Sequence, residues 1–181
     1  MLPPGHVAAG FLVASTITHF FGVNLTKEQV NILLAVGAFS GFAPDLDMFY
    51  AFYKIGRFIQ PVEKVNHRLF ITHTPIFWLV LGSVLMLWMG GDFGIATGLV
   101  VSFGGLSHLF FDSIQYGVMW LWPFNRTQYA LLPISSSPTA KDGTFMSFWL
   151  FFLFAYTKVL RSTFFVELFF LAVSVLVFVL R

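Results

Sequence analysis

The amino-acid sequence predicts an all-α membrane protein, a polytopic bundle of five or six transmembrane helices. Of its 181 residues, 57% are apolar and only 10% are charged, whereas soluble domains carry about 25% charged residues. The mean hydropathy is +0.82, and phenylalanine alone occurs 25 times. A core of this size cannot bury so much apolar surface, so we expect the surrounding solvent to be lipid. We interpret residues 1–181 as one integral-membrane domain.

Composition also excludes several classes of site. The chain has no cysteine, which excludes a disulfide framework and a thiolate metal site. The net charge of +2 is too small for a nucleic-acid surface, so we expect no nucleic-acid partner. The first residues, "MLPPGHVAAG", lack a basic region and a cleavage site, so we expect no removable signal peptide.

The first two predicted helices span residues 6–23 and 29–50. Thr26 precedes the second helix and is a plausible N-cap, because its hydroxyl can accept a hydrogen bond from the first turn. Pro44 lies near the far end of this helix and should kink or end it. A polar loop over residues 51–72 follows.

The third helix should begin at Pro75, because Thr74 is a suitable cap and proline suits the first helical position. It ends at "MGGD", and the fourth helix covers residues 94–116. After a second polar loop, residues 144–180 form a C-terminal hydrophobic region that is too long for one ordinary span. Lys158 and Arg161 mark the expected break between a fifth and a sixth helix, although one long tilted helix is an alternative.

The distribution of cations predicts the orientation of the bundle, because cytoplasmic loops are enriched in lysine and arginine. With a cytoplasmic N-terminus, seven cations face the cytoplasm and three face outside. The inside set is Lys54, Arg57, Lys64, Arg68, Arg126, Lys141 and Arg181, and the outside set is Lys27, Lys158 and Arg161. We therefore expect a cytoplasmic N-terminus.

Ionisable side chains gather at the cytoplasmic ends of four predicted helices. Such residues are costly within a membrane and usually functional. The set is His6, Asp45, Asp47, His67, His73, His108 and Asp112. His19 lies near the opposite end of the first helix with no carboxylate expected beside it, so we interpret it as an interfacial histidine. The ordered set predicts a site within residues 1–130.

Spacing supports a metal site. His108 and Asp112 are four residues apart and share one helical face, as the paired ligands of helical zinc motifs do; a plain helix-stabilising pair is the alternative. In "PDLD", Pro44 disrupts the regular helix, so Asp45 and Asp47 can both turn toward one site. Asp45 is the better ligand candidate, and solvated acids at a helix end are the alternative.

The stretch "NHRLFITHTP" supplies the remaining groups. His67 and His73 are six residues apart and would diverge on a helix, but a loop can fold both inward. Arg68 is always charged and binds carboxylate or phosphate with its fork of donors. A snorkelling arginine at the cytoplasmic interface is the alternative.

Imidazole and carboxylate ligands favour zinc first, with manganese or iron as alternatives, and one or two ions. We expect His6, Asp45, His67, His108 and Asp112 to be the metal ligands. A metal-bound water becomes a nucleophile near neutral pH. Arg68 would stabilise charge developing on a phosphoryl oxygen, and Asp47 or His73 would shuttle the proton.

The ordered set of His6, "PDLD", "HRLFITHT", "HLFFD" and "GVMWLWPF" resembles the YdjM-like family over roughly residues 1–130. Its members are described as LexA-regulated, membrane-bound, predicted metal-dependent hydrolases of bacterial and archaeal cytoplasmic (inner) membranes. The resemblance implies that location and a functional set of His6, Asp45, Asp47, His67, Arg68, His73, His108 and Asp112.

The ligand order is also similar to part of the zinc-dependent phospholipase C and nuclease superfamily, whose members cleave phosphodiesters. This chain has no histidine after Asp112, so the superfamily's last ligand motif is missing and a three-metal cluster is not expected. The similarity implies a phosphoester or phospholipid-like substrate, with membrane lipid as environment and possible substrate.

Two other functions remain open. A metal transporter would need polar groups continuing across the bilayer, and the extracytoplasmic halves of the predicted helices are almost purely apolar. A structural metal site is closed by protein ligands, whereas a catalytic site keeps an open position, and the sequence does not distinguish these. An intramembrane metalloprotease is less favoured, because H-E-x-x-H is absent.

Overall fold

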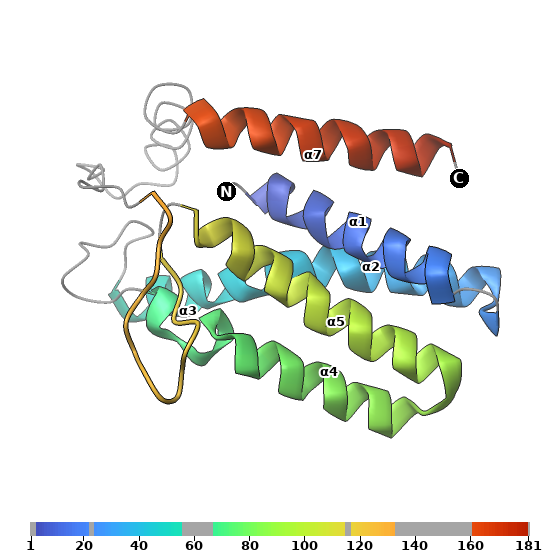
Figure 1. Cartoon of the computed structure of the whole chain (residues 1–181), viewed down its shortest axis with the longest axis horizontal. Helices are drawn as coiled ribbons and strands as arrows, with labels where there is room; N and C mark the ends of the chain where they lie inside the picture. Colours follow the sequence, from blue (N-terminus) through green and yellow to red (C-terminus); the bar gives the residue numbers. More distant parts are fainter. Residues whose placement is uncertain (1–2, 22–23, 56–66, 115–116, 133–160, 181) are drawn as a thin grey trace.

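The computed structural model describes residues 3–21, 24–55, 67–114, 117–132 and 161–180. Over these residues the protein is all-helical, which confirms the predicted fold class at that level (Figure 1). The elements are α1 (Pro3–Phe21), α2 (Lys27–Phe42), η2 (Ala43–Leu46), α3 (Asp47–Ile55), η3 (His67–Leu69), η4 (Ile71–His73), α4 (Pro75–Met89), α5 (Gly91–Asp112) and α7 (Arg161–Val179). A single antiparallel bridge joins Val118 to Tyr129 in the segment after α5.

The boundaries of α2 follow from two residues singled out in the sequence. Thr26 caps the helix: its hydroxyl accepts from the backbone N–H of Gln29 at 3.2 Å, and the Gln29 side chain accepts from the Thr26 N–H at 2.9 Å. At the other end α2 stops at Phe42, and Pro44 lies in the 3-10 turn η2. The expected single helix over residues 29–50 is therefore α2, η2 and α3 in succession.

The start of α4 is also as predicted, at Pro75. The Thr74 side chain does not cap the helix; its hydroxyl donates to the Ile71 carbonyl at 2.6 Å and so closes η4. Gly90 and Gly91 have φ of 64° and 58°, values that glycine adopts without strain. They turn the chain directly from α4 into α5, which begins at Gly91 rather than at residue 94.

The interior of the bundle is formed where α1, α2 and α5 meet. Ala14, Leu33, Ala96 and Val100 are each 0% exposed there. Small residues let the helices approach closely: a side chain on Gly10 would overlap the backbone of α2. Figure 1 shows α4 along α5 and α7 along α1. The helices are thus packed closely enough to hold polar side chains of different helices next to one another.

Two stretches are long and apolar enough to cross a membrane, Lys27–Tyr50 and Gly91–Asp112. Pro75–Met89 and Phe164–Val179 are shorter apolar helices, so five or six spans remain a prediction. Large apolar side chains are nevertheless exposed on α1, α2, α4, α5 and α7, for example Leu87 at 83% and Phe178 at 70%. Soluble monomers rarely expose such continuous apolar surface. The predicted break near Lys158 lies outside the described residues, and α7 begins at Arg161.

Candidate metal centre

Five of the predicted residues meet at one end of the bundle. His6 comes from the first turns of α1, Asp45 from η2 and His73 from η4, while His108 and Asp112 come from the last two turns of α5. His6, His73, His108 and Asp112 are each at most 1% exposed. Residues up to 106 positions apart in sequence therefore share one buried site.

Close packing of α1 against α2 brings His6 to the end of α5. Gly41 of α2 lies against the backbone of His6, where a side chain would not fit. The Gly41 carbonyl also lies 2.9 Å from Nδ1 of His108. This hydrogen bond requires the proton on Nδ1, so the lone pair of Nε2 points into the site.

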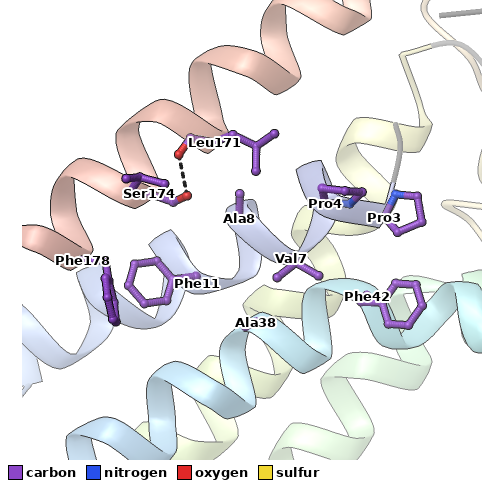
Figure 2. A pocket seen from close by; sticks show the side chains of 11 residues that line it. Pro3, Pro4, Val7, Ala8, Phe11, Ala38, Phe42, Leu171, Ser174 and Phe178 are labelled. Carbon is purple, nitrogen blue, oxygen red and sulfur yellow. Dashed lines mark hydrogen bonds between the residues drawn. The ribbon is translucent and has the colours of Figure 1, made fainter. Parts of the chain in front are cut away.

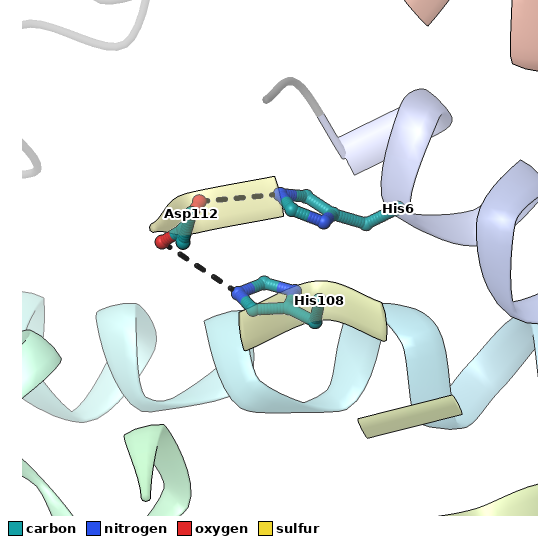
Figure 3. A group of neighbouring side chains, drawn as sticks. All are labelled: His6, His108 and Asp112. Atoms are coloured by element: carbon teal, nitrogen blue, oxygen red, sulfur yellow. Dashed lines mark ion pairs between the residues drawn. The ribbon is translucent and has the colours of Figure 1, made fainter. Parts of the chain in front are cut away.

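His6, His108 and Asp112 form the first of two possible metal-binding groups (Figure 3). The two imidazole rings stack with centroids 3.8 Å apart and planes at 23°. His6 Nε2 is 3.5 Å from Asp112 Oδ1, and His108 Nε2 is 3.8 Å from Asp112 Oδ2. Figure 3 shows the carboxylate reaching toward both rings.

Asp45, His73 and His108 form the second group. Asp45 Oδ1 is 3.5 Å from His108 Nε2 and 4.0 Å from His73 Nε2. The 3-10 turn after Pro44 carries Asp45 inward, where its side chain is 15% exposed. His108 belongs to both groups, but its Nε2 atom can coordinate only one ion.

The donor set fits a metal ion. Both ring nitrogens of His6 and Nε2 of His108 are buried and make no hydrogen bond within the described part of the chain. Leaving such nitrogens without partners is costly unless something else binds them. Bonds of about 2.0–2.2 Å to a tetrahedral ion would separate the donor atoms by roughly 3.3–3.6 Å. In the first group, the 3.5 Å between His6 Nε2 and Asp112 Oδ1 lies within that range, and the 3.8 Å between His108 Nε2 and Asp112 Oδ2 is slightly longer.

Arg68 provides the positive charge beside this group. Its Nε donates to Asp112 Oδ2 at 2.8 Å, with the arginine side chain 19% exposed and the aspartate side chain 2% exposed. The ion pair keeps a buried carboxylate ionised, and ionised carboxylate is the form that binds metals. Arg68 is therefore paired with a residue of the first group, and its functional role remains a prediction.

Asp47 holds His73 in place. Its Oδ2 atom lies 2.9 Å from His73 Nδ1 and accepts a hydrogen bond from the Thr72 hydroxyl at 2.6 Å. Trp78 donates to the Thr72 carbonyl at 2.7 Å and so fixes η4 to α4. These contacts direct Nε2 of His73 toward Asp45 and His108. Burial lowers the pKa of His73 to about 3, and the nearby His108 acts in the same direction, so this imidazole is neutral at pH 7.

The remaining predicted residues lie as follows. His67 begins η3, and its side chain lies outside what the structure describes. His19 is exposed in the last turn of α1. Two residues that contact the site, Gly41 and Thr72, were not predicted from the sequence. Thr72 adjoins His73 and could have been suspected, whereas the role of a backbone carbonyl leaves no signal in side-chain patterns.

Comparison with known proteins places this sequence in a family. The family model described as YdjM inner membrane protein matches residues 1–181, so the similarity includes the C-terminal region as well as residues 1–130. No curated protein and no solved structure matches the chain. Because the family match covers the whole sequence, this chain belongs to the YdjM inner membrane protein family.

Proposed function

We propose that this inner membrane protein is a metal-dependent hydrolase that cleaves a phosphoester bond in a phospholipid-like substrate. The observation that carries the proposal is the buried group of His6, His108 and Asp112, in which both His6 ring nitrogens and Nε2 of His108 make no hydrogen bond among the described residues. Three protein ligands that leave a position open are typical of catalytic zinc, whereas structural zinc is fully enclosed. Zinc is the proposed ion, with manganese or iron as alternatives.

A bound zinc ion would lower the pKa of a coordinated water toward about 7 and so supply a nucleophile at neutral pH. His6, His108 and Asp112 would hold the ion. Arg68 donates to Asp112, so its positive charge lies beside the proposed ion, where it would stabilise a phosphoryl oxygen of the substrate. Charge that develops on this oxygen during attack is stabilised by donors that are fixed in advance.

His73 handles the proton in this proposal. As a water oxygen bonds to phosphorus, Nε2 of His73 would accept the proton of that water. The phosphorus–oxygen ester bond would break, and His73 would give the same proton to the leaving oxygen, so that the imidazole is neutral again. Asp47, 2.9 Å from Nδ1, stabilises the imidazolium while it exists, as a buried aspartate does for a catalytic histidine in other hydrolases. Asp45 and His73 would instead hold a second ion if two ions bind.

Metal content tests the first step. Mass spectrometry on detergent-purified protein should find near-stoichiometric metal in the wild type and in His19→Ala, and little in His6→Ala or His108→Ala. Asp45→Ala distinguishes one ion from two, because loss of a second ion would reduce the stoichiometry by one. Absence of metal from the wild type, with folding unchanged in the variants, would overturn the proposal and leave a structural membrane protein.

Activity tests the second step. A panel of lipid and soluble phosphoesters should be hydrolysed by the metal-bound protein and not after chelation. Bound metal without turnover of any substrate would favour a structural metal site. Uptake of the metal into sealed proteoliposomes would instead favour the transport alternative.

We also propose a multi-pass topology with a cytoplasmic N-terminus and the metal centre at the cytoplasmic face. The natural chain has no cysteine, so single cysteines report accessibility directly. Asn24 and Thr127 are exposed at opposite ends of the bundle. In intact spheroplasts an impermeant maleimide should label Asn24→Cys, and it should label Thr127→Cys only after permeabilisation. The reverse pattern would invert the topology.

A further inference from the structure

An apolar cavity of about 550 Å³ lies between α1, α2 and α7 (Figure 2). Its lining includes Val7 and Phe11 of α1, Ala38 and Phe42 of α2, and Leu171 and Phe178 of α7. Ser174 also lines it, but its hydroxyl donates a hydrogen bond to the Leu171 carbonyl at 2.8 Å, so this donor already has a partner within α7. This groove therefore offers a ligand almost only apolar surface.

At one end of the groove, two lining residues directly follow, in the sequence, residues that belong to or contact the metal centre. Val7 follows His6, and Phe42 follows Gly41, whose carbonyl contacts His108. Successive residues of a helix point in different directions, so α1 directs His6 into the metal centre and Val7 into the groove. In Figure 2, Phe42 marks the end of the groove near Pro3 and Pro4, and Phe178 marks the other end. A molecule occupying both sites would be polar at one end and apolar at the other.

The groove is open to its surroundings along α7, where Val175 is 60% and Phe178 70% exposed. In an inner membrane protein these surroundings are lipid chains. The volume falls within the range of about 300–1,000 Å³ typical of small-molecule sites. A partner helix is about 10–12 Å in diameter, so two turns of it would fill roughly 850–1,200 Å³, which is more than the 550 Å³ of the cavity. An acyl chain is the occupant whose shape and polarity fit.

We infer that the groove holds one acyl chain of a membrane phospholipid and thereby places the headgroup phosphate at Arg68 and the metal centre. This inference rests on the proposed function for the role of the phosphate. It assigns α7, which contributes no residue to either metal-binding group, to substrate binding. Pro3 and Phe11 are eight residues apart on α1, so the groove follows roughly 12 Å of that helix.

Photolabelling tests the inference without requiring cleavage. The probe is a phospholipid with a diazirine at the end of one acyl chain, added to the full-length protein in detergent, and labelled peptides are identified by mass spectrometry. Labels should concentrate on groove residues of α1 and α7. Labels spread evenly over exposed apolar residues, such as Leu87 and Trp88 of α4, would overturn the inference.

Filling the groove should displace the chain. Ala38→Trp should lower groove labelling about tenfold, which corresponds to about 1.4 kcal/mol. Ala35→Trp is the matched control, because Ala35 is exposed on the same helix and does not line the groove. Val175→Trp, with exposed Ala172→Trp as its control, repeats the test on α7 should Ala38→Trp fail to fold. Equal labelling in a filled variant and its control would overturn the inference.

A diacylglycerol with the same photoreactive chain tests the link to the metal centre. It should label the groove more weakly than the phospholipid, because it lacks the phosphate that Arg68 would hold. Equal labelling by both probes would overturn that link. Failure of the proposed function is distinguishable: a protein that labels as expected but hydrolyses no phosphoester keeps the groove and loses the enzymatic role.

Discussion

The two ends of the helix bundle carry the same kinds of polar residue in opposite environments. At the end with the metal centre, His6, His108 and Asp112 are at most 1% exposed. At the other end, His19 and Asp92 are exposed, and Asp92 accepts a hydrogen bond from Asn24 at 2.6 Å. Burying polar groups is costly unless a partner compensates. The difference shows that burial, more than residue type, distinguishes the end at which these polar groups would need a bound partner.

The largest effect is expected from a substitution that removes a metal ligand at the buried end, compared with a histidine substitution at the exposed end. His108→Ala removes the nitrogen common to both metal-binding groups. We expect metal affinity to fall by more than the roughly 10–100-fold typical of outer-shell changes, whereas His19→Ala should leave it unchanged. Competition with a chelator measures both affinities. Equal affinity in the two variants would mean that the buried cluster is not the binding site.

Removing Arg68 should destabilise the metal-free protein. Arg68→Ala leaves the Asp112 carboxylate buried without this ion pair, and breaking a buried pair costs about 3–5 kcal/mol. Because Arg68 is 19% exposed, we expect the lower end of that range. Denaturant unfolding of chelator-treated protein measures the loss. Asn24→Ala, at the exposed end, should change the free energy of unfolding by less than about 0.5 kcal/mol.

Asp47→Asn sharpens the assignment of His73. The amide keeps the shape of the side chain but loses the charge that would stabilise an imidazolium. We expect kcat to fall about 100-fold with metal content retained, and Asp92→Asn should have no effect on either. Steady-state kinetics and metal analysis on the same preparations separate the outcomes. Loss of metal from Asp47→Asn would make His73 a ligand rather than the proton carrier.

The smallest expected effect concerns helix formation at the exposed end. Thr26→Ala removes the side-chain half of the capping box on α2 and should cost about 1 kcal/mol. Thr26→Ser keeps the hydroxyl, so its free energy of unfolding should differ from that of the wild type by only a few tenths of a kcal/mol. Thermal unfolding of the two variants provides the comparison, and metal content should be unaffected in both. Metal loss in Thr26→Ala would show that the two ends are coupled.

Local features could be predicted because their causes lie within a few residues of chain. The start of α4 at Pro75 and the end of α2 before Pro44 follow from what proline does to the backbone. The spacing of His108 and Asp112 places both side chains on one helical face in any α-helix. The sequence predicted that Pro44 would kink or end the second helix, but not the succession of α2, η2 and α3, because it does not specify how the chain continues after proline.

By itself, the sequence determined the helical class, the lipid surroundings and the end of the bundle at which polar residues gather, since composition and helical spacing act locally. Only the tertiary structure decided which atoms meet. The contact between His108 and the Gly41 carbonyl joins residues 67 positions apart, and it exists because glycines let α1 and α2 approach. The groove beside Val7 likewise depends on where α7 packs. Such contacts are properties of helix packing, and no pattern within one helix encodes them.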